Sequence, residues 1–177
     1  MRRSELEHVI RASSAVAEDN EIIAIGSQAI LGQFPDAPDE LLRSNEPDVV
    51  PMNKPERSIV VDGAIGELSA FHHTFGYYAH GVALDTAVLP SGWRERLIRV
   101  CNENTKGAIG WCLEVHDLAA SKLAAGREKD LEFVSTLFRH RLAIAEILAE
   151  RTATLPIAND RRDALVQRVW ALVARVW

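Results

Sequence analysis

The chain has 177 residues, 47% of them hydrophobic and 25% charged, which is typical of one globular core with room for a small appended subdomain. The formal net charge of −5 disfavours a general duplex-DNA binder, because such proteins are usually basic. No apolar run approaches membrane-spanning length, the N-terminus lacks the apolar stretch of a signal peptide, and the two cysteines form no disulfide framework, so we expect a cytoplasmic protein without a membrane partner.

The chain begins with the pattern of a helix followed by a short strand. Apolar residues recur at helical spacing over residues 4–18 and predict an amphipathic helix. Residues 21–25 are a short apolar run that predicts a strand. Gly26 and Ser27 follow it directly and open the sequence SQAILG, which predicts a helix with a serine in its first turn.

The next segment is rich in proline. The sequence DELLR predicts one helical turn. Pro47 and Pro51 restrict the residues before them to extended geometry, so residues 45–51 are expected to be a strand entrance or an edge strand. Residues 53–66 predict a polar segment and a helix that ends at Gly66.

Further strands are predicted before the period of the sequence changes. They are GYYAHGVAL, TAVLP, RLIRVCN and GAIGWCLEV, and Gly110 in the last of these is a candidate bulge. From His116 onward the pattern is helical. The predicted helices are HDLAASKLAAG, which Gly126 would stop, EKDLEFVSTLFRH, RLAIAEILAER and DRRDALVQRVWALVARVW.

This order of elements predicts an α+β fold class. A small mixed sheet flanked by helices would form a core over residues 1–113. A helical C-terminal region, residues 114–177, would follow and pack on that core.

The chemistry-bearing residues of the first half are two carboxylates and a glycine-serine pair. Glu46 and Asp48 are two apart in an extended segment, so their side chains are expected to point to the same face. Two like charges that close repel unless a cation lies between them, and magnesium prefers hard oxygen ligands of this kind. Gly26 would let the backbone approach a phosphate closely, and Ser27 would add a hydroxyl donor at a helix N-terminus. The pattern therefore predicts a Mg²⁺ site for phosphoryl or nucleotidyl transfer.

The stretch IGSQAI followed by EPDVV resembles the signature of the nucleotidyltransferase superfamily with the polymerase-β-type fold. That signature is an apolar residue, glycine, glycine or serine, and then two carboxylates around an apolar residue. The stretches DGAIGELSAFHHTFGYYAHGV, LPSGWRERL and GWCLEVHDLAASKLAAGREKDLEFV are similar to small bacterial nucleotidyltransferase-like proteins related to the toxins of abortive-infection systems. The resemblance covers roughly residues 20–150. Three departures are Glu46 in place of the usual aspartate, Pro47 in place of an apolar residue, and a gap between Gly26 and Glu46 that is longer than in the compact members.

The resemblance implies that a third carboxylate from a later strand completes the metal site. Asp85, in GVALDTAVL, is the candidate, with Asp62 and Glu67 as alternatives. Glu46, Asp48 and Asp85 would then be the catalytic carboxylates that hold Mg²⁺.

The resemblance also implies that the later block lines the nucleotide site through Lys122, Lys129 and Asp130. A lysine pairs with triphosphate oxygens as a point charge. Asp130 would either orient that lysine or act as a base on the acceptor hydroxyl. Arg127, in GREKD, is a further candidate for binding phosphate.

Each of these features also has a purely structural interpretation. A glycine-serine pair is by itself typical of a helix start, the two acids beside prolines are compatible with solvated loop charges, and an aspartate facing a turn is common. The lysines and the aspartate of the later block fit ordinary ion pairs at helical spacing. The cysteines and histidines lack a zinc spacing, and GSQAILG is no nucleophile elbow, so a zinc site and a serine hydrolase are disfavoured.

The last predicted helix carries an apolar stripe from Leu165 to Val176, with Trp170 and Trp177 near it. Such stripes usually pack on their own domain, but a terminal tryptophan is also compatible with a partner or homodimer surface. Residues 139–177 contain seven arginines and four acids, a mildly basic balance that favours RNA contact only weakly.

Together these observations predict an enzyme. It would transfer a nucleoside monophosphate from a nucleoside triphosphate to a hydroxyl of RNA, such as a tRNA, or of a protein, as the toxin of a toxin–antitoxin or phage-defence pair. The alternative is a catalytically degraded protein of the same fold that binds a cognate toxin or antitoxin or another regulatory partner. A third hypothesis is an oligomeric adaptor that associates through its tryptophan-bearing tail.

Overall fold

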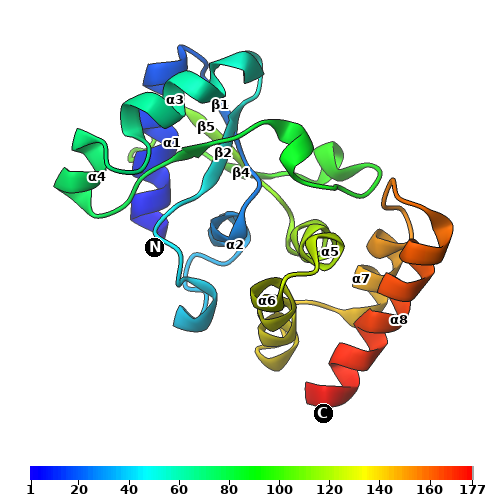
Figure 1. Cartoon of the computed structure of the whole chain (residues 1–177). Helices are drawn as coiled ribbons and strands as arrows, with labels where there is room; N and C mark the ends of the chain where they lie inside the picture. The colour runs from blue at the N-terminus through cyan, green and yellow to red at the C-terminus, as the bar shows by residue number, and fades with distance from the viewer. Residues whose placement is uncertain (177) are drawn as a thin grey trace. The chain divides into compact units, whose positions relative to one another are not determined.

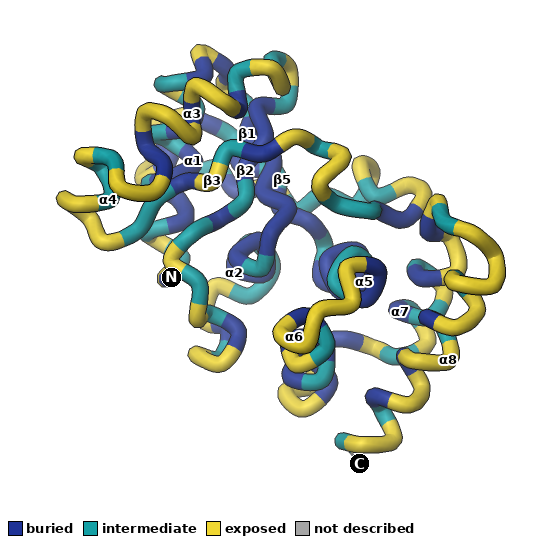
Figure 2. The backbone as a smooth tube through the Cα atoms, in the orientation of Figure 1, coloured by how far each residue is buried: buried dark blue, intermediate teal, exposed yellow. Residues whose placement is uncertain are grey.

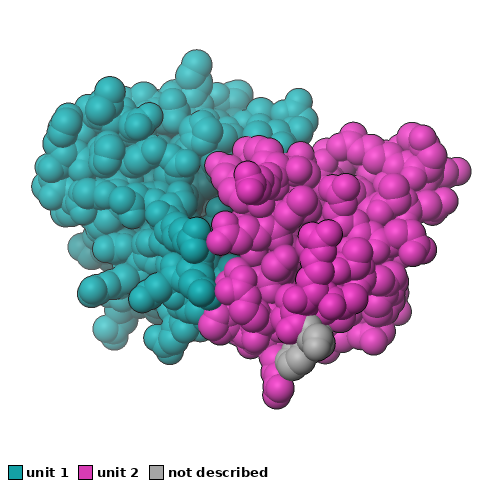
Figure 3. Space-filling model, turned by 60° about the horizontal axis from the view of Figure 1, so that its bottom comes forward, with its two compact units in different colours: residues 1–86, 97–113 teal, residues 87–96, 114–177 magenta. Residues whose placement is uncertain are grey.

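The computed structural model describes residues 1–176, so the prediction for Trp177 lies outside the described residues. The chain forms two compact units, each coloured separately in Figure 3. Unit 1 contains residues 1–86 and 97–113, and unit 2 contains residues 87–96 and 114–177. Unit 1 holds a mixed sheet with helices and unit 2 is helical, so the predicted α+β fold class is confirmed.

The elements are labelled in chain order in Figure 1. The helices are α1 (Arg3–Ala17), α2 (Ile30–Gln33), α3 (Ser58–Ile65), α4 (Ala70–Phe75), α5 (Val115–Ala125), α6 (Glu128–Arg139), α7 (Ala145–Thr152) and α8 (Asn159–Val176). The strands are β1 (Glu21–Ala24), β2 (Asp48–Pro51), β3 (His80–Gly81), β4 (Ile98–Val100) and β5 (Ile109–Cys112). Short 3₁₀ turns are η1 (Ser27–Ala29), η2 (Asp39–Leu41), η3 (Pro55–Arg57), η4 (Leu84–Thr86) and η5 (Trp93–Arg96).

The sheet of unit 1 has the strand order β3-β2-β1-β5-β4. Strand β1 is central, pairing antiparallel with β2 and parallel with β5, and its apolar residues are buried, as Figure 2 shows in dark blue. Strand β2 pairs parallel with β3, which is one of the two edge strands, β4 being the other. Because β1 and β2 run in opposite directions, the end of β1 lies beside the start of β2, where Ala24 pairs with Val49. This register places the turn Gly26-Ser27, which follows β1, beside the acidic residues Glu46 and Asp48 at the start of β2.

Two helices pack on the same face of β5. A Cβ on Gly110 would lie 2.4 Å from Cδ1 of Ile10 in α1, and a Cβ on Gly32 in α2 would lie 2.4 Å from Cβ of Cys112. Gly110 and Cys112 are two apart in the strand and therefore share a face. The bulge predicted at Gly110 was wrong, because the pairing of β1 with β5 continues through it without interruption. The glycine instead gives α1 room for close approach.

The region predicted as the strand GYYAHGVAL contains only the two-residue strand β3. Helix α4 precedes it, because the Ser69 side chain accepts a hydrogen bond from the His72 N–H at 3.1 Å and caps the helix. Gly76 ends the helix in a left-handed conformation at φ 77°. The segment TAVLP forms no strand either, and it begins in the turn η4.

Unit 2 consists of helices α5 to α8 together with the segment 87–96. Helix α5 ends as predicted at Gly126, which has φ 70°. Leu165, Val169 and Leu172 of α8 are buried, so the apolar stripe of the last helix is covered within its own unit. Trp170 remains 42% exposed. None of the helices in the described part of the chain has both the length and the apolarity needed to cross a membrane.

Candidate nucleotide and metal site

The turn after β1 and the start of β2 form one compact feature in unit 1. The Ile25 N–H donates to the Asp48 carbonyl at 3.0 Å, which fixes the two backbones side by side. A Cβ atom on Gly26 would lie 2.2 Å from Oδ2 of Asp48, so the carboxylate occupies the space that a side chain at position 26 would need. Ser27 follows as the first residue of η1 and is half-buried. The glycine-serine turn and Asp48 are therefore in direct contact in the structure.

The second oxygen of Asp48 is held by a histidine from the neighbouring strand. Oδ1 of Asp48 lies 2.8 Å from Nδ1 of His80, and the two residues are paired in the parallel register of β2 and β3. The side chain of Asp48 is 35% exposed and that of His80 is 51% exposed, so solvent reaches both.

Glu46 is paired in the same way with Tyr78, and each of these residues lies two positions before Asp48 and His80, respectively. The hydroxyl of Tyr78 donates a hydrogen bond to the Glu46 carboxylate. This hydrogen bond, together with burial and the negative charge of Glu46, raises the pKa of Tyr78 above its ordinary value. The Tyr78 ring also lies 4.5 Å from the His72 ring, centroid to centroid.

These four side chains form two cross-strand pairs, Glu46 with Tyr78 and Asp48 with His80, along β2, β3 and the residues before them. The Tyr78 N–H donates to the Asn45 carbonyl and the His80 N–H donates to the Pro47 carbonyl, so the two segments run in parallel register. Side chains two apart on an extended segment share a face, which accounts for Glu46 beside Tyr78 and Asp48 beside His80. Tyr78 and His80 were not predicted as site residues. Tyr78 and His80 are two residues apart, as Glu46 and Asp48 are. This equal spacing was the signal in the sequence from which the pairing could have been predicted.

The predicted third carboxylate lies elsewhere in unit 1. Asp85 is exposed in the turn η4 instead of on a strand. Of its two alternatives, Asp62 in α3 accepts a hydrogen bond from the Gly81 N–H at 3.3 Å, and Glu67 is exposed. In residues 1–176 no group of three or more histidine, cysteine or acidic side chains is gathered closely enough to hold a metal ion. The carboxylates of Glu46 and Asp48 nevertheless fit magnesium by donor type.

A buried amide next to the glycine-serine turn adds a second observation. Gln28 lies in η1 and is fully buried, yet neither its amide nitrogen nor its amide oxygen has a hydrogen-bond partner among the described residues. Buried polar groups are nearly always hydrogen-bonded, so this amide is an exception beside the glycine-serine turn. The turn that carries Gly26 and Ser27 therefore has unused hydrogen-bonding capacity.

The later predicted residues belong to unit 2 and form a separate cluster there. Asp130 in α6 is buried, and Lys122 Nζ lies 3.0 Å from its Oδ1 while Arg127 Nε lies 2.6 Å from its Oδ2. Burial alone would raise the pKa of Asp130, but hydrogen bonds and charge from Arg127 and Lys122 lower it below its ordinary value. Lys122 also lies 5.1 Å from the centroid of the Phe133 ring. Asp130 is therefore held between two cationic side chains.

Lys129 stands apart from this cluster. It follows in the first turn of α6 and is exposed, whereas Lys122 is only 13% exposed. The two lysines therefore differ in what they can contact. Lys122 is committed to a buried carboxylate, and Lys129 presents its ammonium group to solvent.

A second buried ion pair joins the segment 87–96 to α5 within unit 2. Arg96 donates to both oxygens of Asp117, at 2.8 and 2.9 Å, and the Asp117 side chain is fully buried. Burial raises the pKa of Asp117, and Arg96 only partly offsets that effect. Next to it, Glu114 caps α5 by accepting from the His116 N–H at 3.0 Å. These contacts join the segment 87–96 and the start of α5 within the helical unit.

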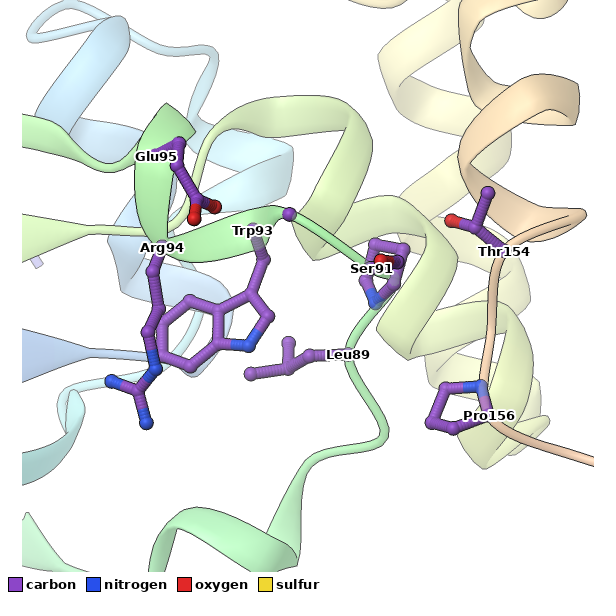
Figure 4. A pocket seen from close by; sticks show the side chains of 9 residues that line it. Leu89, Ser91, Trp93, Arg94, Glu95, Thr154 and Pro156 are labelled. Atoms are coloured by element: carbon purple, nitrogen blue, oxygen red, sulfur yellow. The ribbon is translucent and has the colours of Figure 1, made fainter.

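Unit 2 also contains an open cavity of about 410 Å³. Figure 4 shows side chains of the segment 89–95 on one side of it and Thr154 and Pro156 on the other. Two of the lining residues stack on each other, the Arg94 guanidinium lying 4.5 Å from the centroid of the Trp93 ring. None of the lining residues belongs to the predicted nucleotide or metal site.

Comparison with known proteins connects the chain to one family. A family model described as a nucleotidyltransferase of unknown function (DUF6036) matches residues 4–173, which is nearly the whole chain. Searches of curated proteins and of solved structures found no match to the chain. The matched residues include parts of both units, the sheet as well as the C-terminal helices.

Proposed function

The chain belongs to this family of nucleotidyltransferases, and from that premise we propose that it transfers a nucleoside monophosphate from a nucleoside triphosphate to a hydroxyl of RNA or protein. In that reaction the acceptor oxygen forms a bond to the α-phosphorus, the bond from that phosphorus to the bridging oxygen breaks, and pyrophosphate leaves with that oxygen. The proton of the hydroxyl passes to a base or to solvent.

The observation that carries this proposal is the contact between Gly26 and Asp48. Gly26 lies in the turn that follows β1, and the carboxylate of Asp48 in β2 fills the space beside its Cα. The backbone of the turn and the acid are therefore adjacent. Gly26 allows close approach to a phosphate, and Ser27 contributes a hydroxyl donor. Glu46 and Asp48 would hold Mg²⁺, which when bound neutralises the triphosphate and favours departure of pyrophosphate.

The residues of unit 2 have a supporting role in the proposal. Asp130 holds Lys122 and Arg127 in fixed positions, as their short distances indicate. Cations positioned in this way attract phosphate with less loss of side-chain entropy than mobile ones. Lys129 is exposed and would contact a triphosphate or an RNA backbone directly. The setting that we propose is the toxin of a toxin–antitoxin or phage-defence pair.

A direct experiment tests the enzymatic proposal. The full chain is incubated with each of the four labelled ribonucleoside triphosphates, Mg²⁺ and either total cellular RNA or protein extract. We expect label transfer that Asp48→Asn abolishes and that Asp36→Asn, at an exposed acid in the loop before η2, leaves intact. The absence of transfer to any acceptor, with no change in melting temperature on adding nucleotide and metal, would reject the proposal.

One observation favours the alternative of a non-catalytic binding protein. Tyr78 and His80 already satisfy Glu46 and Asp48, as expected for carboxylates that have become structural. This alternative predicts stable association with a partner protein, such as a cognate toxin or antitoxin, and an association constant that Asp48→Asn does not change. Loss of that association in Asp48→Asn, with label transfer present in the native chain, would decide against it.

A further inference from the structure

We propose that the chain associates with a second copy of itself through two different surfaces. An exposed apolar surface on α3 and α4 of one copy binds the side of α8 that carries Trp170 in the other copy. We call the first surface the α3–α4 face, and it comprises Ile59, Val60, Leu68 and Phe75. This inference rests on no part of the proposed reaction.

The α3–α4 face gathers most of the large hydrophobic side chains that are exposed in the described part of the chain. Ile59 and Leu68 are 77% and 73% exposed, and Val60 and Phe75 are also exposed. A Cβ on Gly63, in the middle of α3, would have no described atom within 4 Å. Helices α3 and α4 are neighbours, and Figure 2 shows both largely in yellow. Single exposed apolar residues are ordinary, whereas a group of them on adjacent short helices indicates an interaction surface.

The backbone at Leu68 is a second observation that points to a partner. Leu68 has φ 62°, a left-handed conformation that is uncommon for a bulky residue. Its N–H donates to Nδ1 of His72 at 3.0 Å, and Ser69 caps α4, so the loop is held in this conformation. The result is a strained backbone that presents an apolar side chain to solvent. Strain of this kind is typical of functional positions, and here the function that fits is contact with another molecule.

The charge around the α3–α4 face selects the type of partner. The sequence has no lysine or arginine between Arg57 and Arg94, whereas Glu56, Asp62 and Glu67 are exposed. This acidic rim disfavours nucleic acids and anionic lipid surfaces, which bind basic proteins. Two α3–α4 faces packed on each other would bring their acidic rims together. The α3–α4 face therefore fits a surface that is apolar and basic.

Helix α8 presents such a surface. Trp170 is 42% exposed, and Ala171 and Ala174 are exposed beside it. Arg168 and Arg175 are exposed on the same helix, and residues 164–176 contain no acidic side chain. Tryptophan and arginine are the residue types that contribute most to protein interfaces, and the small alanines let another helix approach closely. The two arginines complement the acidic rim of the α3–α4 face.

An association of this kind joins unlike surfaces, and every copy carries both of them. Such a contact is heterologous, so one copy can bind a neighbour through its α3–α4 face and another through its α8. A variant that damages one surface retains the other. This property separates the proposal from a symmetric dimer, in which the same surface is used twice.

The test follows association of the full chain by sedimentation velocity over a range of protein concentrations. We expect the native chain to associate reversibly, and Leu68→Gly and Trp170→Ala each to weaken association by at least about tenfold. Leu68→Gly should keep or raise the melting temperature, because glycine adopts φ 62° without strain, so unfolding cannot explain its effect. Ile144→Ser, at an exposed isoleucine outside both surfaces, is the matched control and should associate as the native chain does.

Mixing the two interface variants tests whether the contact joins unlike surfaces. The Leu68→Gly chain keeps its α8 and the Trp170→Ala chain keeps its α3–α4 face, so an equimolar mixture should form a complex of two copies. Association of the native chain should also weaken at high salt, since the surfaces have opposite charge. A native chain that stays monomeric at every concentration would overturn the proposal and leave the α3–α4 face to another occupant. Undiminished association of either variant, or no pairing in the mixture, would overturn it as well.

Discussion

The carboxylate of Asp48 fills the space above Gly26: a Cβ at position 26 would be 2.2 Å from Oδ2 and 2.8 Å from Cγ of Asp48. Gly26→Ala must therefore displace the carboxylate. We expect loss of metal affinity and of nucleotidyl transfer by more than about tenfold, with a loss of stability of only about 1–2 kcal/mol, because Asp48 is partly exposed and can rotate outward. Isothermal titration with metal and chemical unfolding measure the two effects.

Gly63→Ala is the matched control for this prediction. No atom lies within 4 Å of a Cβ at that position in α3, so the variant should be neutral or more stable by about 0.5–1 kcal/mol. In an Asp48→Ala background the stability cost of Gly26→Ala should become smaller, since the carboxylate is gone and only the Cβ of residue 48, at 3.1 Å, remains close. An undiminished cost in that background would contradict the assigned contact.

Arg96→Ala should destabilise the protein, and the effect should depend on pH. The change removes the main partner of a fully buried carboxylate, Asp117, at a cost of about 3–5 kcal/mol near neutral pH. The pKa of Asp117 is raised by burial, and losing Arg96 raises it further. A raised carboxyl pKa gives stability that is complete below the ordinary value of 3.8 and is lost as pH rises through the folded-state pKa.

The difference between Arg96→Ala and the native chain should therefore be larger at pH 7 than below the ordinary pKa of Asp117. Urea unfolding at the two pH values measures it. Arg94→Ala is the control, because Arg94 is exposed and stacks on the ring of Trp93, so its cost should stay below about 1 kcal/mol. If Arg96→Ala lowered the free energy of unfolding by the same amount at both pH values, the loss of the ion pair with Asp117 would not be the cause of the destabilisation.

Lys122→Met should destabilise the protein, and Lys129→Met should not. Lys122 pairs with the buried Asp130 at 3.0 Å, so its removal should cost about 3 kcal/mol at neutral pH, whereas an exposed lysine should change stability by less than about 0.5 kcal/mol. The pKa of Asp130 is lowered, so the stability from this pairing is present above the ordinary value of 3.8 and is lost as pH falls through the folded-state pKa.

Thermal unfolding of the two lysine variants at neutral and acidic pH measures this difference. Nucleotide affinity measured on the same samples adds a second readout. A stable Lys122→Met chain with weakened nucleotide binding would mean that Lys122 serves the ligand and not the fold.

The two cysteines should differ in reactivity toward a thiol reagent. Cys112 is fully buried against Gly32, and burial raises the pKa of its thiol to about 12, so it should not react in the folded chain. Cys101 is half-buried and should react. Titration of native and urea-unfolded protein should give one and two reactive thiols, respectively. A native Cys101→Ser chain that still reacts at the same rate would contradict the assignment.

Some elements could be predicted because their causes are local. Apolar residues at helical spacing identify α1 and α8, and Gly126 marks the end of α5 because its left-handed conformation favours glycine. The two acids of EPD and the glycine-serine turn are likewise visible in the chain, and so is the resemblance to nucleotidyltransferases. The segment GYYAHGVAL misled, because only His80 and Gly81 of it pair as a strand and the turn η4 already begins at Leu84.

The sequence by itself determined most helices, the α+β class and the residue types of the candidate site, since periodicity, caps and motif spacing act over a few residues. Only the tertiary structure decided that Tyr78 and His80 face the two acids and that Asp130 is buried between two cations. The parallel pairing of β2 with β3 joins residues 32 positions apart. Such pairing depends on the packing of the whole sheet, and no local pattern records it.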